Sequence, residues 1–243
     1  MSHAAGPLFQ PLYLQIRALL TRSLDAGEWK PGEAIPSELE LAGRYKVSHG
    51  TVRKAIDALV DANLLIRQQG RGTFVATHTR DRLLYYFFHV VPEGGAKEYP
   101  DVRLCAFARG KADRVEADKL AIELGEPVVR IRNLLHLGGE PVIVDDLAIA
   151  AARFPGLTEK QFRERPSTIY HLYQDTFGIT VTRSSERLRA VVADADAASL
   201  LNVPRGAPLL AIRRVALGLA GEPVEWRVSR VNTARHEYYA EIG

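Results

Sequence analysis

The segment VSHGTVRKAI, residues 47–56, places polar and cationic side chains at the front of an apolar helical pattern. Hydroxyl, imidazole and guanidinium groups are donors that proteins use to contact phosphates and base edges. A residue without a side chain, Gly50, would let the backbone come close to a DNA duplex. The candidate DNA contacts in this segment are Ser48, His49, Gly50, Thr51, Arg53 and Lys54.

A second candidate contact is Gly70-Arg71-Gly72, in which one cation stands between two residues that favour turns. The cations of the chain are concentrated near these two segments. The formal net charge of the whole chain is +3, whereas residues 44–71 carry six cations against two acids. A polyanion such as DNA is the natural partner of so basic a window, and a solvated basic surface is the alternative.

Three helices and a hairpin are predicted around these residues. Apolar residues recur at helical spacing over residues 11–26, and Ser37 opens a second helical pattern, SELELAGRY. Ser48 is a suitable N-cap for a third helix with one apolar stripe. The stripe consists of Val52, Ala55, Ile56, Leu59 and Val60. LLIRQQGRGTFVA then predicts two short strands joined by a turn, which completes a winged helix-turn-helix.

The polar residues of the third helix lie off its apolar stripe, at the end that would enter a major groove. Each residue taken alone also has a structural interpretation. Gly50 could be a turn glycine, Arg53 a solvated helix residue and Arg71 a loop charge. Their order and spacing together favour DNA binding.

The motifs PSELELA, VSHGTVRKAIDAL and QGRGTFV resemble the DNA-binding domain of the GntR family of bacterial transcriptional regulators, over residues 8–76. The matching positions that the resemblance supports are Thr51, Arg53, Gly70, Arg71 and Gly72. Ser37 and Glu38 of the motif PSELELA are also expected to bind DNA. Leu39 and His49 stand where family members usually carry arginines that contact DNA. We therefore expect a different base preference at the matching positions of the operator, the DNA site that the protein recognises.

Composition excludes several other classes of protein. The apolar content of 47% and charged content of 25% are those of a globular domain, and the single cysteine, Cys105, allows no disulfide within the chain. No run approaches the roughly 18 apolar residues of a membrane span, and the N-terminus lacks the pattern of a secretory signal. We expect a cytoplasmic protein without a membrane partner. The histidines show no metal-binding spacing, and no cofactor is predicted.

A second domain is predicted over residues 85–243, after a polar linker over residues 77–84. Residues 117–144 and 198–226 share one pattern of a short helix, a strand, a hairpin containing GEPV and another strand. This internal duplication predicts one antiparallel sheet with pseudo-two-fold symmetry and helices on one face. The expected fold class is therefore α+β.

This second part is similar to the effector-binding (UTRA) domain of the HutC-type branch of the family, which shares its fold with chorismate lyase. The resemblance implies a ligand cleft in which an R-x-R pair receives a phosphate or carboxylate. It assigns that pair to Arg130 and Arg132, and the duplication suggests that Arg227 pairs with Asp145 or Asp146. A cross-strand ion pair is the alternative role for Arg132. The expected effector-binding residues are Arg130, Arg132, Asp145, Ser167, Tyr170, Glu225 and Arg227.

The sequence thus predicts a homodimeric regulator, by default a repressor, that binds double-stranded operator DNA under the control of a small anionic effector. Two alternatives remain. The C-terminal part could serve only for dimerisation, or the chain could be a lyase-like enzyme fused to a DNA-binding domain. No catalytic set of residues supports the enzyme, and fold likeness alone does not transfer activity.

Overall fold

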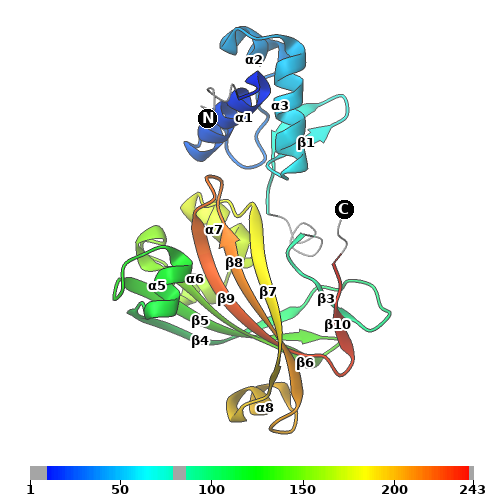
Figure 1. Ribbon diagram of the computed structural model, residues 1–243, viewed down its shortest axis with the longest axis vertical. Coiled ribbons are helices and arrows are strands. Elements are labelled where there is room, and N and C mark those ends of the chain that lie inside the picture. Colours follow the sequence, from blue (N-terminus) through cyan, green and yellow to red (C-terminus); the bar gives the residue numbers. More distant parts are fainter. Residues whose placement is uncertain (1–9, 79–85, 241–243) are drawn as a thin grey trace, which may run out of the picture. The chain divides into compact units, whose positions relative to one another are not determined.

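A computed structural model of the chain describes residues 10–78 and 86–240. The chain forms two compact units, divided between Thr77 and His78 (Figure 1). The domain limits expected from the sequence, 8–76 and 85–243, remain predictions, and most of the expected linker 77–84 lies outside the described residues. No helix of the described ranges is both long enough and apolar enough to cross a membrane.

The first unit contains the three predicted helices. They are α1 (Leu12–Asp25), α2 (Glu38–Tyr45) and α3 (His49–Asp61). Helix α3 buries its stripe of Val52, Ala55, Ile56 and Leu59 against the other two helices. Three residues connect α2 to α3, and the first of them, Lys46, has a left-handed backbone (φ 54°) that ends α2. This short connection fixes the helix-turn-helix.

A hairpin follows the helices, as predicted. Strand β1 (Leu65–Gln68) pairs antiparallel with β2 (Gly72–Val75). Gly70 and Gly72 at its turn have positive φ values of 73° and 115°, which residues with side chains rarely adopt. The two glycines thus allow the tight turn that presents Arg71 at the tip of the wing.

The second unit is built on a six-stranded antiparallel sheet with the order β4-β5-β6-β9-β8-β7. The order is symmetric about its centre, where β6 and β9 pair. Each half contains an outer strand, a short helix and a hairpin, which confirms the predicted duplication. The elements are β4 (Asp101–Lys111), α5 (Arg114–Leu120), β5 (Pro127–Leu137), β6 (Glu140–Ala150), β7 (Arg183–Val192), α8 (Ala195–Leu201), β8 (Pro208–Leu217) and β9 (Pro223–Asn232).

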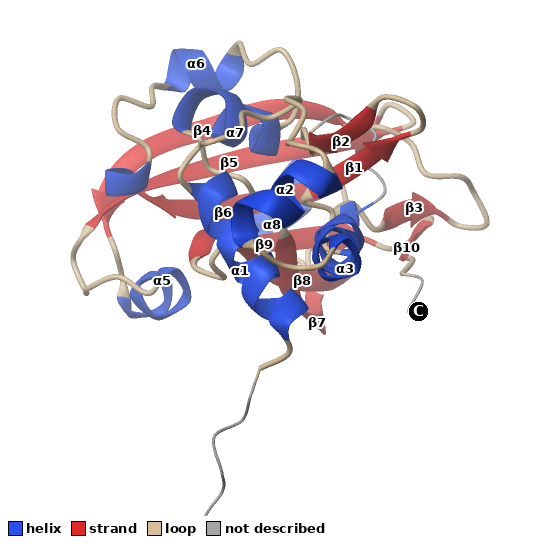
Figure 2. Cartoon of the chain, turned by 90° about the horizontal axis from the view of Figure 1, so that it is seen from above, coloured by secondary structure: helices blue, strands red, loops and turns tan. Residues whose placement is uncertain are grey.

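The helices of the two repeats, α5 and α8, share one face of this sheet, as predicted, and further helices cover the opposite face. Helix α5 packs over Val128 and α8 packs over Leu134. Three helices lie between α5 and α8 in the sequence: η1 (Ala151–Arg153), α6 (Glu159–Arg163) and α7 (Ile169–Phe177). Helices α6 and α7 pack over the other face of the sheet (Figure 2). Successive strand residues point to opposite faces, so Ile131 belongs to the α7 face while Arg130 and Arg132 belong to the α5–α8 face.

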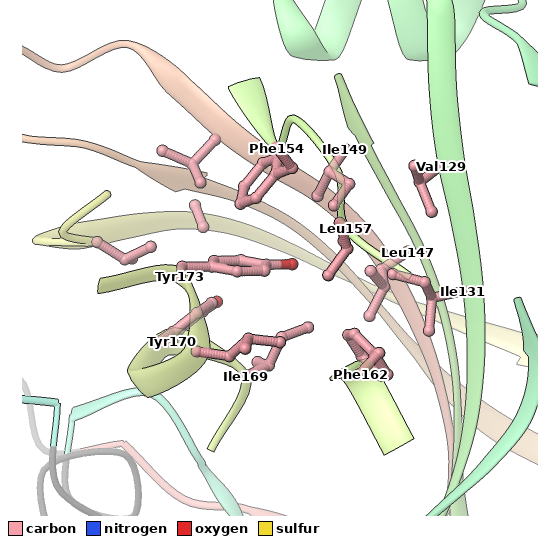
Figure 3. Packing of buried hydrophobic residues seen from close by; sticks show 14 of the residues in the cluster. Val129, Ile131, Leu147, Ile149, Phe154, Leu157, Phe162, Ile169, Tyr170 and Tyr173 are labelled. Atoms are coloured by element: carbon pink, nitrogen blue, oxygen red, sulfur yellow. The ribbon is translucent and has the colours of Figure 1, made fainter. Parts of the chain in front are cut away.

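The largest core of the second unit lies between the sheet and helices α6 and α7 (Figure 3). Phe154, Phe162, Tyr170 and Tyr173 are completely buried there. The ring centroid of Phe154 lies 4.6 Å from that of Tyr173. Thr168 caps the N-terminus of α7, and Gly178 ends the helix with a left-handed backbone, as predicted. The core therefore fixes the position of α7 against the sheet.

A small second sheet consists of β3 (Val90–Pro92) and β10 (His236–Tyr238). The sequence LYYFFHVV, residues 84–91, has the composition of a strand, but of its described residues, 86–91, only the last two belong to β3. Phe87 and Phe88 of this segment serve the core instead, since both are buried, whereas Tyr86 is exposed.

Replacement of Phe154 by alanine should lower the free energy of unfolding of the second unit by about 3–5 kcal/mol, because it leaves a cavity among rings that cannot close it. Urea unfolding followed by circular dichroism measures this change. Leu124→Ala, at a position 68% exposed, is the matched control and should change stability by less than about 0.5 kcal/mol. Equal effects of the two substitutions would contradict the packing described.

Candidate DNA-binding surface and effector cavity

The first residues of α3 combine capping with an open polar surface. The Ser48 hydroxyl accepts a hydrogen bond from the backbone N–H of Thr51 (3.2 Å), and the hydroxyls of the two residues lie 2.8 Å apart. Ser48 therefore caps α3, as predicted. A Cβ atom added at Gly50 would meet no other atom within 4 Å. Packing within the protein therefore does not require a glycine at position 50.

The cations of the window 44–71 divide into two groups. Arg44 forms an ion pair with Glu28, and Arg67 pairs with Glu38 (2.8 Å) and Asp57 (2.9 Å). Within the described ranges, the other cations have no acidic partner. These unpaired cations are Lys46, Arg53, Lys54 and Arg71. The positive charge available to a polyanion is therefore concentrated on α3, its preceding turn and the wing.

Glu38 has an internal role that sequence reasoning did not predict. Its carboxylate lies 2.9 Å from Nε2 of His49 and 2.8 Å from Arg67. It thereby joins the first turn of α2 to the first turn of α3 and to β1. Its proximity to two basic side chains offsets a negative charge that would otherwise repel phosphates. The structure thus places Glu38 as a residue that orients His49, whose side chain is 53% exposed.

Ser37 and the wing residues also have defined local roles. Ser37 and Glu40 form a capping box at the start of α2, and hydrogen bonds from the Ser37 side chain and backbone lower the pKa of the Glu40 carboxyl. At the wing, the guanidinium of Arg71 lies over the Phe74 ring, 5.6 Å from its centroid. The capping box holds Ser37 at the surface. The contact with Phe74 positions Arg71 and leaves its positive charge without a counter-ion among the described residues.

The second unit contains a cavity of about 390 Å³ on the α7 face of its sheet. Among the predicted effector-binding residues, Asp145, Ser167 and Arg227 line it. Glu225 and Tyr170 are completely buried and contact Arg227. The lining also contains polar residues that sequence reasoning missed. They are Asp101, Asn133, Arg163, Arg165, Thr168 and Arg214.

Arg227 is the centre of a buried network. Its guanidinium contacts Oδ2 of Asp145 (2.9 Å) and Oε1 of Glu225 (2.8 Å). Burial disfavours the charged form, but Glu225 and Asp145 outweigh it and raise the pKa of Arg227 well above its usual value. The pairing with Asp145 confirms the one suggested by the internal duplication.

Two tyrosines complete this network from α7. The Tyr173 hydroxyl donates to Glu225 (2.9 Å), and the Tyr170 hydroxyl lies 3.5 Å from the same carboxylate. Burial raises the pKa of Tyr170 to about 12, and the charge of Glu225 adds to this shift. Both hydroxyls therefore remain protonated near neutral pH, and Glu225 is held from three sides.

Three polar atoms of the cavity lining are buried without a hydrogen-bond partner in the described part of the chain. They are Nε of Arg165, Oδ1 of Asn133 and Oδ1 of Asp145. Buried polar groups are normally satisfied, and an unsatisfied one costs about 1–3 kcal/mol. One donor and two acceptors of the lining residues thus lack a partner among the described residues. No motif of the sequence points to Arg165 or Asn133.

Arg130 and Arg132 lie on the opposite face of the sheet from this cavity, so the predicted site does not come together as one cluster. Arg130 pairs with Glu116 (2.6 Å), and Arg132 pairs with Asp146 (2.6 Å) and Asp196 (2.7 Å). The reason is the alternation of strand residues, which places both arginines between α5 and α8. The alternative role of Arg132, a cross-strand ion pair, is the one that the structure shows.

Comparison with known proteins identifies both units. Residues 12–75 match the model of the gntR family of bacterial regulatory proteins, and residues 96–237 match the UTRA domain. The chain belongs to the GntR family.

Relatives and solved structures agree with this assignment. The "Probable fructoselysine utilization operon transcriptional repressor" of Escherichia coli (strain K12) is 30% identical over 88% of each chain. The histidine utilization repressor of Klebsiella aerogenes is 27% identical over 84% of this chain and 83% of its own. The crystal structure of PhnF from Mycobacterium smegmatis, 26% identical, covers 94% of this chain and 99% of its own with a TM-score of 0.55.

This GntR-family protein is therefore a DNA-binding transcriptional regulator with a UTRA effector-binding domain. The predicted HutC-type relationship, the N-terminal helix-turn-helix and the C-terminal antiparallel sheet are confirmed. The comparisons assign the class of protein. The individual DNA-binding and effector-binding residues remain predictions that rest on the geometry above.

Replacement of Arg227 by methionine should destabilise the second unit by about 3–5 kcal/mol, because it leaves Asp145 and Glu225 buried without their cation. Arg132→Met is the matched control on the opposite face. Its ion pairs are partly exposed, so its loss should cost no more than about 1 kcal/mol. Urea unfolding of the two variants checks the difference, and equal losses would argue against the central role of Arg227.

Proposed function

We propose that this protein is a homodimeric repressor that binds an operator of two related half-sites and is controlled by a small molecule bound in the cavity of the second unit. The observation that carries the proposal is the pairing pattern of the cations. Arg53, Lys54 and Arg71 have no acidic partner within the described ranges, whereas neighbouring arginines are neutralised. A duplex supplies the missing negative charge.

The helix-turn-helix also explains the proposed dimer. Proteins of this type place one recognition helix per subunit in successive major grooves, about one helical turn apart. Helix α3, with His49, Gly50 and Thr51 at its start, would enter the groove, and the wing would contact the backbone through Arg71. The dimer, the cytoplasmic location and the sign of regulation are parts of the proposal, and relatives that are named repressors support the sign.

The cavity favours effector binding over a second unit that serves only for dimerisation. A purely structural domain gains nothing from buried polar atoms that lack partners. A molecule bearing an anionic group would satisfy Arg165 near the N-terminus of α7, where backbone N–H groups also favour negative charge. The effector can change DNA binding only if it binds one conformation of the protein more tightly than the other.

Replacement of Arg53 by alanine should weaken operator binding at least tenfold, because α3 loses an unpaired cation, while stability changes by less than about 0.5 kcal/mol. Fluorescence anisotropy with selected operator DNA and a thermal melt provide the two measurements. Arg44→Ala, which removes a paired arginine of the same unit, should reduce affinity much less. A fall in melting temperature in proportion to the loss of affinity would mean that Arg53 is structural.

Replacement of Arg71 by alanine should reduce the slope of log K against log salt concentration by about one, the effect of one lost phosphate contact. Titrations of operator DNA at several salt concentrations measure the slope for the native chain and the variant. An unchanged slope would remove the wing from the proposed DNA contact.

A further inference from the structure

The charges around the cavity are unevenly distributed. Four arginines line it, and three of them have an acidic partner. Arg163 pairs with Glu159, Arg214 with Glu186, and Arg227 with Asp145 and Glu225. Arg165 is the exception within the described part of the chain. One part of the lining therefore carries an uncompensated positive charge.

Arg165 is held in place without being neutralised. Its guanidinium lies over the Phe162 ring, 4.5 Å from the centroid, and donates to the Phe162 carbonyl oxygen. Its Nε is buried without a partner. Burial lowers the pKa of Arg165, and the nearby charge of Arg227 adds to that shift. A ligand carboxylate or phosphate would supply both the missing charge and the missing acceptor.

Another part of the cavity has an excess of negative charge. Asp145 and Glu225 share the single cation Arg227, so two carboxylates face one guanidinium. Glu225 is satisfied by Arg227 and the two tyrosines. Asp145 is 2% exposed and uses only Oδ2 for Arg227, which leaves Oδ1 without a donor. The unbalanced negative charge therefore lies at Asp145.

Asn133 strengthens this acceptor site. It is the direct cross-strand neighbour of Asp145 in the pairing of β5 with β6, it is 4% exposed, and its Oδ1 also lacks a donor. Two adjacent buried acceptors, one of them charged, form a site for a group with several N–H donors and a positive charge. A hydroxyl would satisfy the hydrogen bonds but would leave the charge uncompensated.

From this arrangement we propose that the effector is a zwitterion, whose acidic group binds Arg165 and whose protonated amine binds Asp145 and Asn133. The inference rests on the proposed function, because it concerns the same cavity. It narrows the ligand from any small anion to an amino acid or another amino-bearing acid. The volume of about 390 Å³ lies within the range of small-molecule sites.

A ligand panel on the full-length native protein tests the proposal. The panel contains the common α-amino acids, the ω-amino acids of about three to six carbons, and amino sugar phosphates. Each compound is matched by the analogue in which hydrogen or hydroxyl replaces the amine. At 10 mM, we expect at least one zwitterion to raise the melting temperature by several degrees through mass action. Its matched analogues should bind at least tenfold more weakly in calorimetry.

Two outcomes of the panel would overturn the proposal. One is that no zwitterion shifts the melting temperature. The other is that an acid without an amine binds as tightly as its amino-bearing partner. Operator binding without ligand is measured in parallel. A protein that binds DNA but ignores zwitterions contradicts only this inference, whereas a protein that binds no DNA contradicts the proposed function.

Two pairs of variants then locate the charges with the zwitterion found in the panel. Asp145→Asn should weaken its binding at least tenfold and reduce the discrimination between amine and hydroxyl. Asp146→Asn is the matched control, because the neighbouring residue lies on the opposite face of the sheet and pairs with Arg132 and Arg230. Arg165→Gln should weaken the same ligand tenfold, and Arg205→Gln, at an exposed arginine outside the cavity lining, should not.

Circular dichroism confirms that each variant is folded before binding is measured. Equal affinities of Asp145→Asn and Asp146→Asn would contradict the assigned amine site, and equal affinities of the two arginine variants would contradict the acid site. The comparison of matched ligands on the native protein does not depend on any substitution, so an unfolded variant leaves the test intact.

Discussion

The ion pairs of Arg227 are the interaction on which the second unit most depends. Strands β6 and β9 meet at the centre of the sheet, where the two halves of the internal duplication join, and Arg227 of β9 reaches Asp145 of β6 across that junction. The same guanidinium holds Glu225, which in turn receives the hydroxyl of Tyr173 from α7. One side chain thus connects both halves of the sheet to the helix that borders the cavity.

The network also sets the electrostatic character of the cavity. Two carboxylates and one guanidinium leave a negative excess, and Arg165 provides a separate positive charge that no acid of the described residues neutralises. The side chains of Asp145 and Arg227 are largely buried, so their charges interact more strongly than they would at the surface. The stability of the domain and the charge of its cavity therefore arise from the same residues. A second buried cation beside Asp145 and Glu225 would neutralise the charge that the cavity can now offer to a ligand.

The first unit follows a related principle. Acids neutralise those cations whose role is structural, as Glu38 does for Arg67, and they leave the cations of α3 and the wing unpaired. Glu38 also orients His49 by linking the starts of α2 and α3. The basic window counted in the sequence is therefore not uniform. The part without acidic partners is the one whose positive charge stays available to a polyanion.

The sequence by itself determined the helix-turn-helix, the hairpin and the duplication, because these depend on local periodicity, caps and turn residues such as Ser48, Gly70 and Gly178. Tertiary structure decided which of the candidate effector-binding residues lie together. Alternation along β5 puts Arg130 and Arg132 on one face and Asn133 on the other, and each face borders a pocket, so a motif of two arginines does not reveal which pocket carries polar groups without partners. Ion pairing also depends on the tertiary structure. Arg132 is neutralised by acids that are distant in the sequence, Asp146 and Asp196, whereas no acid of the described residues neutralises Arg165.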